Sequence, residues 1–416
     1  MHILFLSDNF PPEVNAPASR TFEHCREWVK LGAKVTVITT APNFPSGKLL
    51  AGYKNRLWQA EMMEGIRVIR VWSYITANEG FLRRTLDYVS FMLSGTLTAL
   101  PVRGVDIVVG TSPQFFTVCA ARAVSAIKRV PFVFELRDIW PESIRAVGAM
   151  RDGVALRMLE RLELYLYRKA DAIVCVTHSF KRALSARGVD AAKISVVLNG
   201  ADLSRFTPRE KDAELVRRLG LEGKLVAGYI GTHGMAHGLE TILEAARLMK
   251  ATPYAERIRF LMLGDGARKK VLVGLAQSMG LDNVIFHDSV GKDDVVRFWS
   301  VLDTTIIHLK RSELFTTVIP SKIFEAMAMG LPMICGLDGE SADLVTDEGA
   351  GVRFEPEDAA GLRDVLIKLA GDPSLLAEMR GRCLSAAPGY DRSAQAVKML
   401  DVLNGVVRRG EPSARA

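Results

Sequence analysis

Residues 225–250 read LVAGYIGTHGMAHGLETILEAARLMK and combine an apolar run, a glycine-rich turn and an amphipathic stretch. Residues 225–230 are almost continuously apolar, as strands buried on both faces of a parallel sheet are. Apolar residues then recur at helical spacing over residues 239–250. This order predicts a strand, a turn and a helix, which is the repeating unit of a layered α/β domain with right-handed crossovers.

The same unit recurs along the whole chain. Apolar runs predict strands at residues 3–6, 35–39, 68–71, 107–109, 132–134, 173–176 and 194–197, and then at 225–230, 258–263, 284–287, 304–308, 333–335 and 351–354. Helical patterns lie between them at residues 19–31, 82–100, 115–128, 154–169, 179–186, 239–250, 267–279, 293–299, 322–328 and 359–369. Two such series predict two Rossmann-like, doubly wound α/β domains with parallel sheets.

Three segments follow from this division. We expect an N-terminal domain at residues 1–200, a C-terminal domain at 201–385, and a helix within 386–416 that returns to the N-terminal domain. Two domains suit a chain of this length, because single cores stop growing at about 250–300 residues. Ligands of doubly wound sheets bind beyond the carboxyl ends of the strands. The predicted site is therefore a cleft across which the two domains face each other.

The charge balance narrows the choice of partner. The chain has 54 Lys and Arg against 47 Asp and Glu, a net charge of +7, which suits phosphates, acidic lipids or nucleic acid. Its basic residues are scattered and are not interleaved with aromatic residues, so we expect no nucleic-acid partner. The five cysteines form no C-x-x-C pair and most lie in apolar runs, which predicts reduced core thiols and a cytoplasmic protein.

Two apolar stretches could be mistaken for targeting or membrane segments. Residues 1–7 lack a basic start and break at Asp8, so we expect a first buried strand and no signal peptide. Residues 89–102 contain four Ser or Thr residues and are interrupted at Pro101. A spanning helix needs roughly 18–20 apolar residues, so we expect no transmembrane segment.

Glycine-bearing turns follow two strands of the second series. Gly231, Thr232 and His237 lie in the turn before the helix at 239–250, where backbone N–H groups attract phosphate. Gly264 and Asp265 follow the next strand and are candidates for holding a nucleobase. Either turn could be purely structural. The spacing matches neither G-x-G-x-x-G nor a P-loop, which argues against dinucleotide-dependent oxidoreductases and kinases.

The stretch VIPSKIFEAMAMG, residues 318–330, carries the sharpest signal. Ser321 opens a helix and Gly330 ends it. Lys322 lies in the first turn, where the helix dipole disfavours a cation unless an anion is bound, and a phosphate would resolve that conflict. Glu325 lies one turn later among apolar residues, where its carboxylate can accept hydrogen bonds from both ribose hydroxyls. A solvated Lys–Glu pair is the alternative interpretation.

Polar residues also follow a strand of the first series, in the stretch FELRDIWPE at residues 134–142. Asp138 is placed to accept a proton from an acceptor hydroxyl, and Arg137 to bind a phosphate. A structural Arg–Asp pair would produce the same pattern. Trp140 follows at the same rim of the predicted cleft.

Two further segments of the first half are candidates for contact with the acceptor. Asn15 lies in the loop of residues 8–20, which follows the first strand and is stiffened by three prolines. Residues 81–100 form an apolar helix that begins with Arg83 and Arg84. Such a helix either packs on the sheet or lies on an anionic membrane surface. We expect a membrane contact, because the positive net charge favours it independently.

Four motifs together resemble glycosyltransferase family 4, and the resemblance covers almost the full chain. They are PPEVNAP at 11–17, RDIWP at 137–141, VLNGAD at 197–202 with Phe206, and IPSKIFEAMAMG at 319–330. The chain is most similar to bacterial enzymes that build O-antigen or capsule repeat units. The resemblance implies the GT-B fold, transfer of sugar with retention, and no need for a metal ion or other cofactor.

The resemblance also implies roles for individual residues. Glu325 matches the second glutamate of the family's E-x7-E element, which holds the ribose, while the turn at 231–238 and Lys322 hold the diphosphate. The first glutamate of that element falls at Thr317, so the sugar contact must come from Thr316, Thr317 or backbone N–H groups. The assigned residues are Asp138 and Lys322 for catalysis; Gly231, Thr232, His237, Gly264, Asp265, Ser321, Lys322 and Glu325 for the donor nucleotide; and Asn15, Arg137 and Trp140 for the acceptor.

Other departures from the family concern the same two regions. The usual Arg and Lys of the diphosphate turn are Thr232 and His237 here, and the Gly-Gly of the amino-terminal loop is Asn15-Ala16.

The predicted function is transfer of a sugar, an N-acetylated amino or deoxy sugar, from a UDP-sugar to a polyprenyl-diphosphate-linked saccharide in lipopolysaccharide or capsule synthesis. Helix-start N–H groups and Lys322 would stabilise the departing diphosphate while the acceptor hydroxyl attacks from the same face. We expect the protein at the inner face of the cytoplasmic membrane. The alternatives are a UDP-sugar epimerase or hydrolase, which releases UDP without an acceptor, and a non-catalytic nucleotide-sugar-binding module, which shows no turnover.

Overall fold

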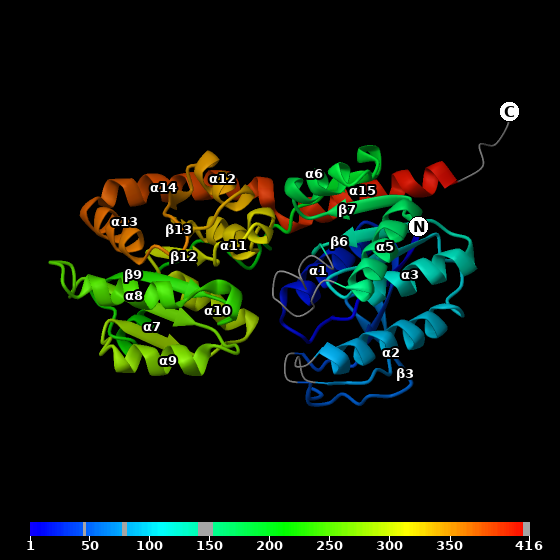
Figure 1. Ribbon diagram of the computed structural model, residues 1–416, viewed down its shortest axis with the longest axis horizontal. Helices are drawn as coiled ribbons and strands as arrows, with labels where there is room; N and C mark the ends of the chain where they lie inside the picture. The colour runs from blue at the N-terminus through cyan, green and yellow to red at the C-terminus, as the bar shows by residue number, and fades with distance from the viewer. Residues whose placement is uncertain (45–46, 77–80, 140–152, 411–416) are drawn as a thin grey trace. The chain divides into compact units, whose positions relative to one another are not determined.

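The computed structural model describes residues 1–44, 47–76, 81–139 and 153–410, and the chain divides into two compact units (Figure 1). Unit 1 comprises Met1–Leu198 and Arg392–Ala416, and unit 2 comprises Asn199–Asp391. Each unit has its own sheet, and helices cover both faces of each sheet (Figure 1). The predicted fold class, two α/β domains with parallel sheets, is confirmed.

Unit 1 contains an eight-stranded sheet in the order β3-β4-β2-β1-β5-β6-β7-β8. Its strands are β1 (His2–Leu6), β2 (Lys34–Thr40), β3 (Trp58–Met63), β4 (Ile66–Val71), β5 (Ile107–Thr111), β6 (Phe132–Leu136), β7 (Ala172–Cys175) and β8 (Ile194–Val196). All neighbours are parallel except β3 and β4. Strand β3 was not predicted, because this edge strand alternates exposed and half-buried residues and contains no apolar run.

The helices of unit 1 lie on both faces of this sheet. They are α1 (Ala16–Lys30), α2 (Phe81–Ala99), α3 (Phe115–Lys128), α5 (Val154–Lys169), α6 (His178–Ala186) and α15 (Arg392–Gly410), with the short η1 (Ala191–Lys193). The crossovers through α2, α3, α5 and α6 all step in one direction along the sheet, so right-handed connections place them on one face. The crossover through α1 steps the other way, and α15 packs against α1 on the opposite face.

Helix α15 brings the end of the described chain back into unit 1. The indole Nε1 of Trp28 on α1 donates a hydrogen bond to the carbonyl oxygen of Ala396 (2.8 Å). Met399 and Leu403 are fully buried in the core beneath the sheet. The core of unit 1 is therefore completed by residues of α15, which follow its last strand only after the whole of unit 2.

Unit 2 contains a six-stranded parallel sheet in the order β11-β10-β9-β12-β13-β14. Its strands are β9 (Leu225–Ile230), β10 (Ile258–Leu263), β11 (Val284–His287), β12 (Thr304–His308), β13 (Met333–Gly336) and β14 (Gly351–Arg353). Its helices are α7 (Ala213–Arg218), α8 (Glu240–Met249), α9 (Lys269–Ser278), α10 (Lys292–Ser300), α11 (Lys322–Met329), α12 (Glu340–Asp347), α13 (Ala359–Gly371) and α14 (Pro373–Ala386), with η2 (Met235–His237), η3 (Leu314–Thr317) and η4 (Ala387–Tyr390). All six strands were predicted, because each is an apolar run.

Among the described helices, none combines the length and the hydropathy needed to cross a membrane. The five cysteines are free thiols, and four of them are buried.

Candidate functional site

Two glycine turns lie against each other at the carboxyl ends of β9 and β10. The amide of Gly231 donates to the carbonyl oxygen of Leu263 (3.0 Å), and the amide of His233 donates to that of Asp265 (2.8 Å). A Cβ atom at Gly264 would overlap the carbonyl oxygen of Gly231. Glycine is therefore required at position 264, where φ is +150°, for the two turns to touch.

Lys322 reaches this pair of turns from the start of α11. Its Nζ lies 3.8 Å from the centroid of the Tyr229 ring, and a Cβ at Gly231 would come within 2.7 Å of the same atom. The Nζ is buried and has no hydrogen-bond partner among the described residues. Burial lowers the pKa of Lys322 to about 7, against which the Glu325 carboxylate acts. A buried ammonium without an acceptor is costly, and an anion at this position would supply one.

Ser321 and Glu325 flank Lys322 at the start of α11. Ser321 stands at the N-cap position, but its hydroxyl makes no capping hydrogen bond, so its oxygen and proton are not used by the helix. Glu325 is half-buried one turn beyond Lys322. Helix α11 ends at Gly330, which adopts the left-handed conformation that commonly terminates helices.

The two histidines of the β9–α8 turn differ in their surroundings. His233 is fully buried between the rings of Tyr229 and Phe286, and burial lowers its pKa to about 4. His237 is partly exposed, and burial together with the charge of Lys322 lowers its pKa to about 3. Both rings are therefore neutral near pH 7. His233 packs in the interior of unit 2. His237 lies in the turn between β9 and α8, as expected from the sequence.

His308, which was not among the predicted site residues, holds this turn in place. Its Nδ1 donates to the carbonyl oxygen of His237 (2.7 Å), and its Nε2 accepts from the amide of Glu357 (3.0 Å). These bonds use both ring nitrogens, and burial lowers the pKa of His308, so the ring is a neutral link. Its position, the last residue of an apolar strand, was the only signal that could have identified it.

A small surface pocket opens beyond the carboxyl ends of β12 and β13. Its lining includes Lys310, Arg311, Thr316 and Asp338. The amide of Lys310 donates to the carbonyl oxygen of Ala236 (2.9 Å), so the pocket adjoins the β9–α8 turn. Thr316, one of the residues expected to replace the missing glutamate, therefore lines a pocket next to the predicted diphosphate site.

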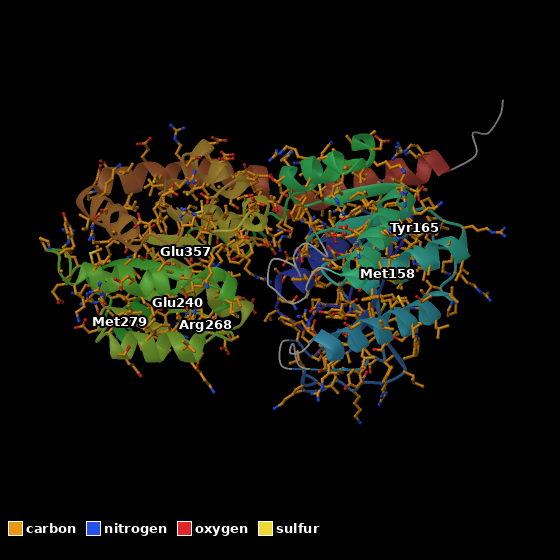
Figure 2. All side chains as sticks on the ribbon, viewed as in Figure 1. Met158, Tyr165, Glu240, Arg268, Met279 and Glu357 are labelled. Atoms are coloured by element: carbon orange, nitrogen blue, oxygen red, sulfur yellow. The ribbon has the colours of Figure 1, made fainter. Side chains whose placement is uncertain are left out.

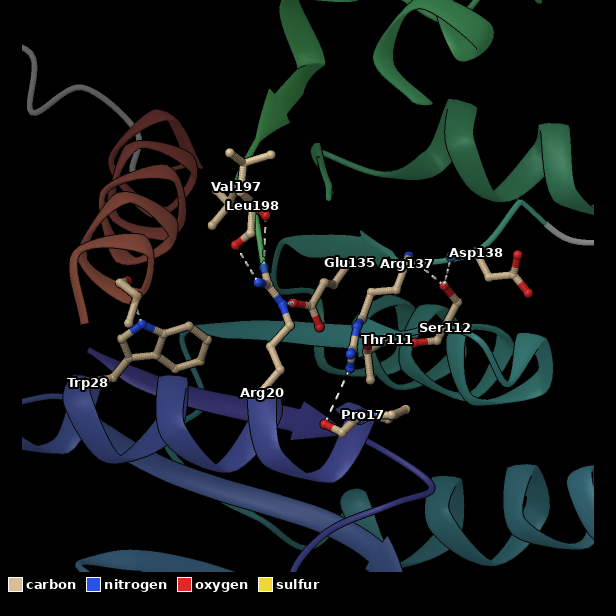
Figure 3. Close-up of polar contacts among 11 residues, drawn as sticks. Pro17, Arg20, Trp28, Thr111, Ser112, Glu135, Arg137, Asp138, Val197 and Leu198 are labelled. Carbon is tan, nitrogen blue, oxygen red and sulfur yellow. Dashed lines mark hydrogen bonds and ion pairs between the residues drawn. The ribbon is translucent and has the colours of Figure 1, made fainter. Parts of the chain in front are cut away.

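In unit 1, Arg137 and Asp138 follow β6 and point in different directions (Figure 3). Both amides donate to the hydroxyl oxygen of Ser112, at 2.8 and 3.2 Å. The carboxylate of Asp138 points away from the guanidinium of Arg137 (Figure 3). The Arg–Asp pair that was the structural alternative is therefore not formed, and Asp138 is directed away from the buried cluster.

The Arg137 guanidinium is buried in a cluster of charges (Figure 3). It donates to the carbonyl oxygen of Pro17 (3.3 Å), and burial lowers its pKa to about 10. Beside it, Arg20 and Glu135 form a buried ion pair (2.9 Å). Arg20 also donates to the carbonyl oxygens of Val197 and Leu198. Arg137 therefore ties β6 to the start of α1, and a phosphate would have to enter this buried cluster to reach it.

Asn15 caps α1. Its side-chain oxygen accepts from the amide of Ala18 (2.8 Å), and its side-chain nitrogen donates to the Asn9 side chain (2.6 Å). The neighbouring Glu13 carboxylate accepts from the amides of Asn43 and Phe44. The loop after β1 is thus held by its own side chains, with Asn15 at its last position.

The predicted site residues fall into two groups. All eight donor-nucleotide residues lie at the carboxyl ends of the strands of unit 2 or at the start of α11. Asn15, Arg137 and Asp138 lie in unit 1, near the start of α1 and the end of β6. Trp140 lies outside the described residues. Among those described, no group of three His, Cys, Asp or Glu side chains is arranged to hold a metal ion.

Comparisons with known proteins match each half of the chain to a family of glycosyl transferases. Residues 15–200 match the family model of a glycosyl transferase 4-like domain, and residues 212–387 match that of glycosyl transferases group 1. WcaI of Escherichia coli (strain K12), assigned as a glycosyl transferase of colanic acid biosynthesis, is 24% identical over 383 residues, covering 88% of this chain and 92% of its own. A GDP-mannose-dependent alpha-mannosyltransferase of Mycobacterium tuberculosis is 23% identical over 85% of this chain and 83% of its own. The structure of Anabaena HepE with UDP-glucose superimposes with a TM-score of 0.72 at 17% identity, covering 97% of this chain and all of that one.

Proposed function

Because this chain belongs to glycosyltransferase family 4, whose members are GT-B enzymes, we propose that it transfers sugar from a UDP-sugar to a lipid-linked saccharide in bacterial surface polysaccharide synthesis. The proposal of a nucleotide-sugar donor rests on the buried Lys322 ammonium. This group has no hydrogen-bond acceptor among the described residues and faces two glycine turns. The likeness to WcaI supports the pathway, and the HepE complex supports UDP as the nucleotide.

Each donor residue has a defined part in this proposal. The amides of the Gly231–Gly238 turn and Lys322 bind the diphosphate and stabilise its charge as it leaves. Glu325 accepts hydrogen bonds from the ribose hydroxyls, and Gly264 and Asp265 border the base. The pocket lined by Thr316 and Asp338 receives the sugar, which we expect to be an N-acetylated amino or deoxy sugar.

On the acceptor side, Asp138 is the group that accepts the proton of the attacking hydroxyl, and Asn15 lies at the same end of the unit 1 sheet. Attack from the face of the departing diphosphate gives retention. No metal or other cofactor is required in this scheme, because Lys322 and the backbone amides supply the positive potential. The polyprenyl diphosphate of the acceptor places the reaction at the inner face of the cytoplasmic membrane.

The test is calorimetric titration with UDP, and with GDP, ADP and NAD for comparison. We expect selective binding of UDP, followed by sugar transfer when UDP-sugars are supplied with membrane-extract acceptors. Selective binding of GDP would instead move the donor to the class used by the mycobacterial relative. Binding of no nucleotide would contradict the proposal, and release of UDP from a UDP-sugar without any acceptor would favour a hydrolase.

Matched variants connect the binding to the assigned site. Glu325→Ala removes the ribose contact, and we expect UDP affinity to fall by about 10- to 150-fold, since hydrogen bonds to charged groups contribute about 1.5–3 kcal/mol. Glu378→Ala on the exposed side of α14 is the control, with unchanged affinity. Unchanged affinity in folded Glu325→Ala would remove the ribose assignment.

A further inference from the structure

One face of unit 1 carries an excess of positive charge. Helices α2, α3, α5 and α6, which cover this face, contain ten Lys and Arg against three Asp and Glu, a net +7 that equals the net charge of the whole chain. Of the three acids, Glu163 is buried and paired with Arg187, and burial raises the pKa of Asp87 to about 7. The exposed charge of this face is therefore almost entirely basic.

Apolar side chains are exposed among these basic residues. Seven large ones on α2, α3 and α5 are 40–68% exposed: Leu86, Leu93, Leu97, Ile127, Val154, Met158 and Tyr165. Steps of four and seven residues place those of α2 in one stripe and those of α5 in another, and Figure 2 shows Met158 and Tyr165 along α5. On the opposite face, α1 and α15 expose one large apolar side chain among their described residues, Val397.

The edge strand β3 extends the same surface. Ile69 on β4 is level with Ile38 on β2, and Ile38 lies directly beneath Gly95 of α2. The β3 residue opposite Ile69 shares this side of the sheet, as do Trp58 and Met62, two positions away on either side. Trp58 and Met62 are more than half exposed, so they add exposed apolar side chains on the side of the sheet that α2 covers.

We propose that this surface, formed by α2, α3, α5, α6 and β3, docks on an anionic lipid bilayer. Clustered Arg and Lys are attracted to anionic headgroups, and leucine, methionine and tryptophan side chains between them enter the boundary of the acyl chains. A nucleic acid would favour aromatic residues for stacking, and here aliphatic residues predominate. The inference rests on the proposed function, because a lipid-linked acceptor requires the enzyme at a bilayer.

The start of α2 joins this docking face to the acceptor side of unit 1. Arg84 donates to the hydroxyl of Tyr88 (2.7 Å), and both residues interact electrostatically with Asp8 in the loop after β1. The same loop ends at Asn15, the predicted acceptor residue. A lipid-linked substrate anchored beneath this face would therefore lie close to the loop that holds Asn15, one of the residues predicted to contact the acceptor.

The test is flotation of the full chain with phosphatidylcholine vesicles, with and without phosphatidylglycerol. We expect binding only to the anionic vesicles, weakening as salt is raised. The triple variant Arg157→Glu, Arg161→Glu, Arg168→Glu reverses three exposed charges on α5. At about 1 kcal/mol per basic residue near the surface, its affinity for vesicles should fall on the order of 100-fold. Leu93→Ser with Leu97→Ser should also weaken binding.

The matched control reverses three exposed charges on the other face, Lys398→Glu, Arg408→Glu and Arg409→Glu on α15. It changes the net charge equally and should retain most of the vesicle binding. Equal loss in both triple variants, or no binding by the unaltered chain, would overturn the docking face. So would a dimer in solution that Leu93→Ser with Leu97→Ser disperses, because the apolar stripe would then contact a second copy. UDP binding, measured in parallel, separates these outcomes from failure of the donor site.

Discussion

Lys322 determines the chemistry of the donor site at the scale of a single residue. Its ammonium is buried, lies on the face of the Tyr229 ring and has no described hydrogen-bond acceptor. The ring face favours a cation, while burial disfavours it, and the pKa falls to about 7. A diphosphate bound here would raise that pKa again, so binding and protonation are linked.

We therefore expect proton uptake when UDP binds. At pH 8 the lysine is mostly neutral in the free protein, and the bound diphosphate restores the ammonium. UDP affinity should decrease as pH rises above about 7. Calorimetry at pH 8 in buffers of different ionisation enthalpy measures the uptake, which should approach one proton and vanish in Lys322→Met. Binding of UDP without proton uptake would show that Lys322 does not meet the diphosphate.

The same residue lowers the stability of the free protein. Because its pKa is lower in the folded than in the unfolded chain, where it is near 10.5, the unfolded chain binds more protons between about pH 7 and 10.5. Its unfavourable contribution is complete below pH 7 and is released as pH rises. Lys322→Met should thus raise the free energy of unfolding by roughly 2–4 kcal/mol at pH 6, and by less at pH 9. Denaturant unfolding at both pH values checks this, with the exposed Lys368→Met as control. A gain that is equal at both pH values would contradict the burial argument.

At the scale of elements, the site depends on the close approach of two strand-to-helix turns. The β9–α8 and β10–α9 turns exchange backbone hydrogen bonds, and His308 at the end of β12 fixes the first of them from the other side. The neighbouring strands β10, β9 and β12 thus supply one continuous rim, and α11 adds Lys322 to it.

Gly264→Ala should separate these two turns. The new Cβ would overlap the Gly231 carbonyl oxygen, and φ at this position is +150°, so we expect a loss of about 2–4 kcal/mol in unfolding free energy together with weaker UDP binding. Gly274→Ala is the control, because Gly274 lies within α9 with open space around its Cβ position. That variant should gain about 0.5–1 kcal/mol from helix propensity. Thermal unfolding and UDP titration of both variants decide the point, and a stable Gly264→Ala that binds UDP normally would refute it.

At the scale of the whole molecule, the chain builds two cores and crosses between them twice. Both crossings are anchored from α1 in unit 1. Arg20 donates to the carbonyl oxygens of Val197 and Leu198 at the first crossing, and Glu23 pairs with Arg392 at the second. The Glu23–Arg392 ion pair is buried, and removal of one partner of a buried pair is strongly destabilising.

Because the chain has two cores, we expect two separate unfolding transitions in scanning calorimetry. UDP at 100 times its Kd should stabilise unit 2 by about 2.7 kcal/mol and raise only the transition that belongs to it. Arg392→Met should lower the other transition, with a loss of about 3–5 kcal/mol in unit 1, because Glu23 loses its buried partner. Lys368→Met on the exposed surface of α13 serves as the control. If UDP raised the transition lowered by Arg392→Met, the assignment of the donor site to unit 2 would be wrong.

Local sequence patterns were sufficient to predict the parallel strands, most of the helices and the protein family. Strands such as Leu225–Ile230 are buried on both faces, so their apolar runs are visible without any contact partner. The exposed strand Trp58–Met63 has no such run and was missed. The signals for the helix start at Ser321 and for its end at Gly330 are also local. They were sufficient to place Lys322 and Glu325 at the start of α11.

The roles of individual charges depended on contacts between distant parts of the chain. His308 meets His237 across 71 residues, and Arg137 meets Pro17 across 120, so neither contact leaves a periodic signal. The basic face of unit 1 likewise joins four helices that are separated in sequence by strands. Hydrophobic periodicity reports which side of an element is buried, whereas the partner of a buried charge is set by the folding of the chain in three dimensions.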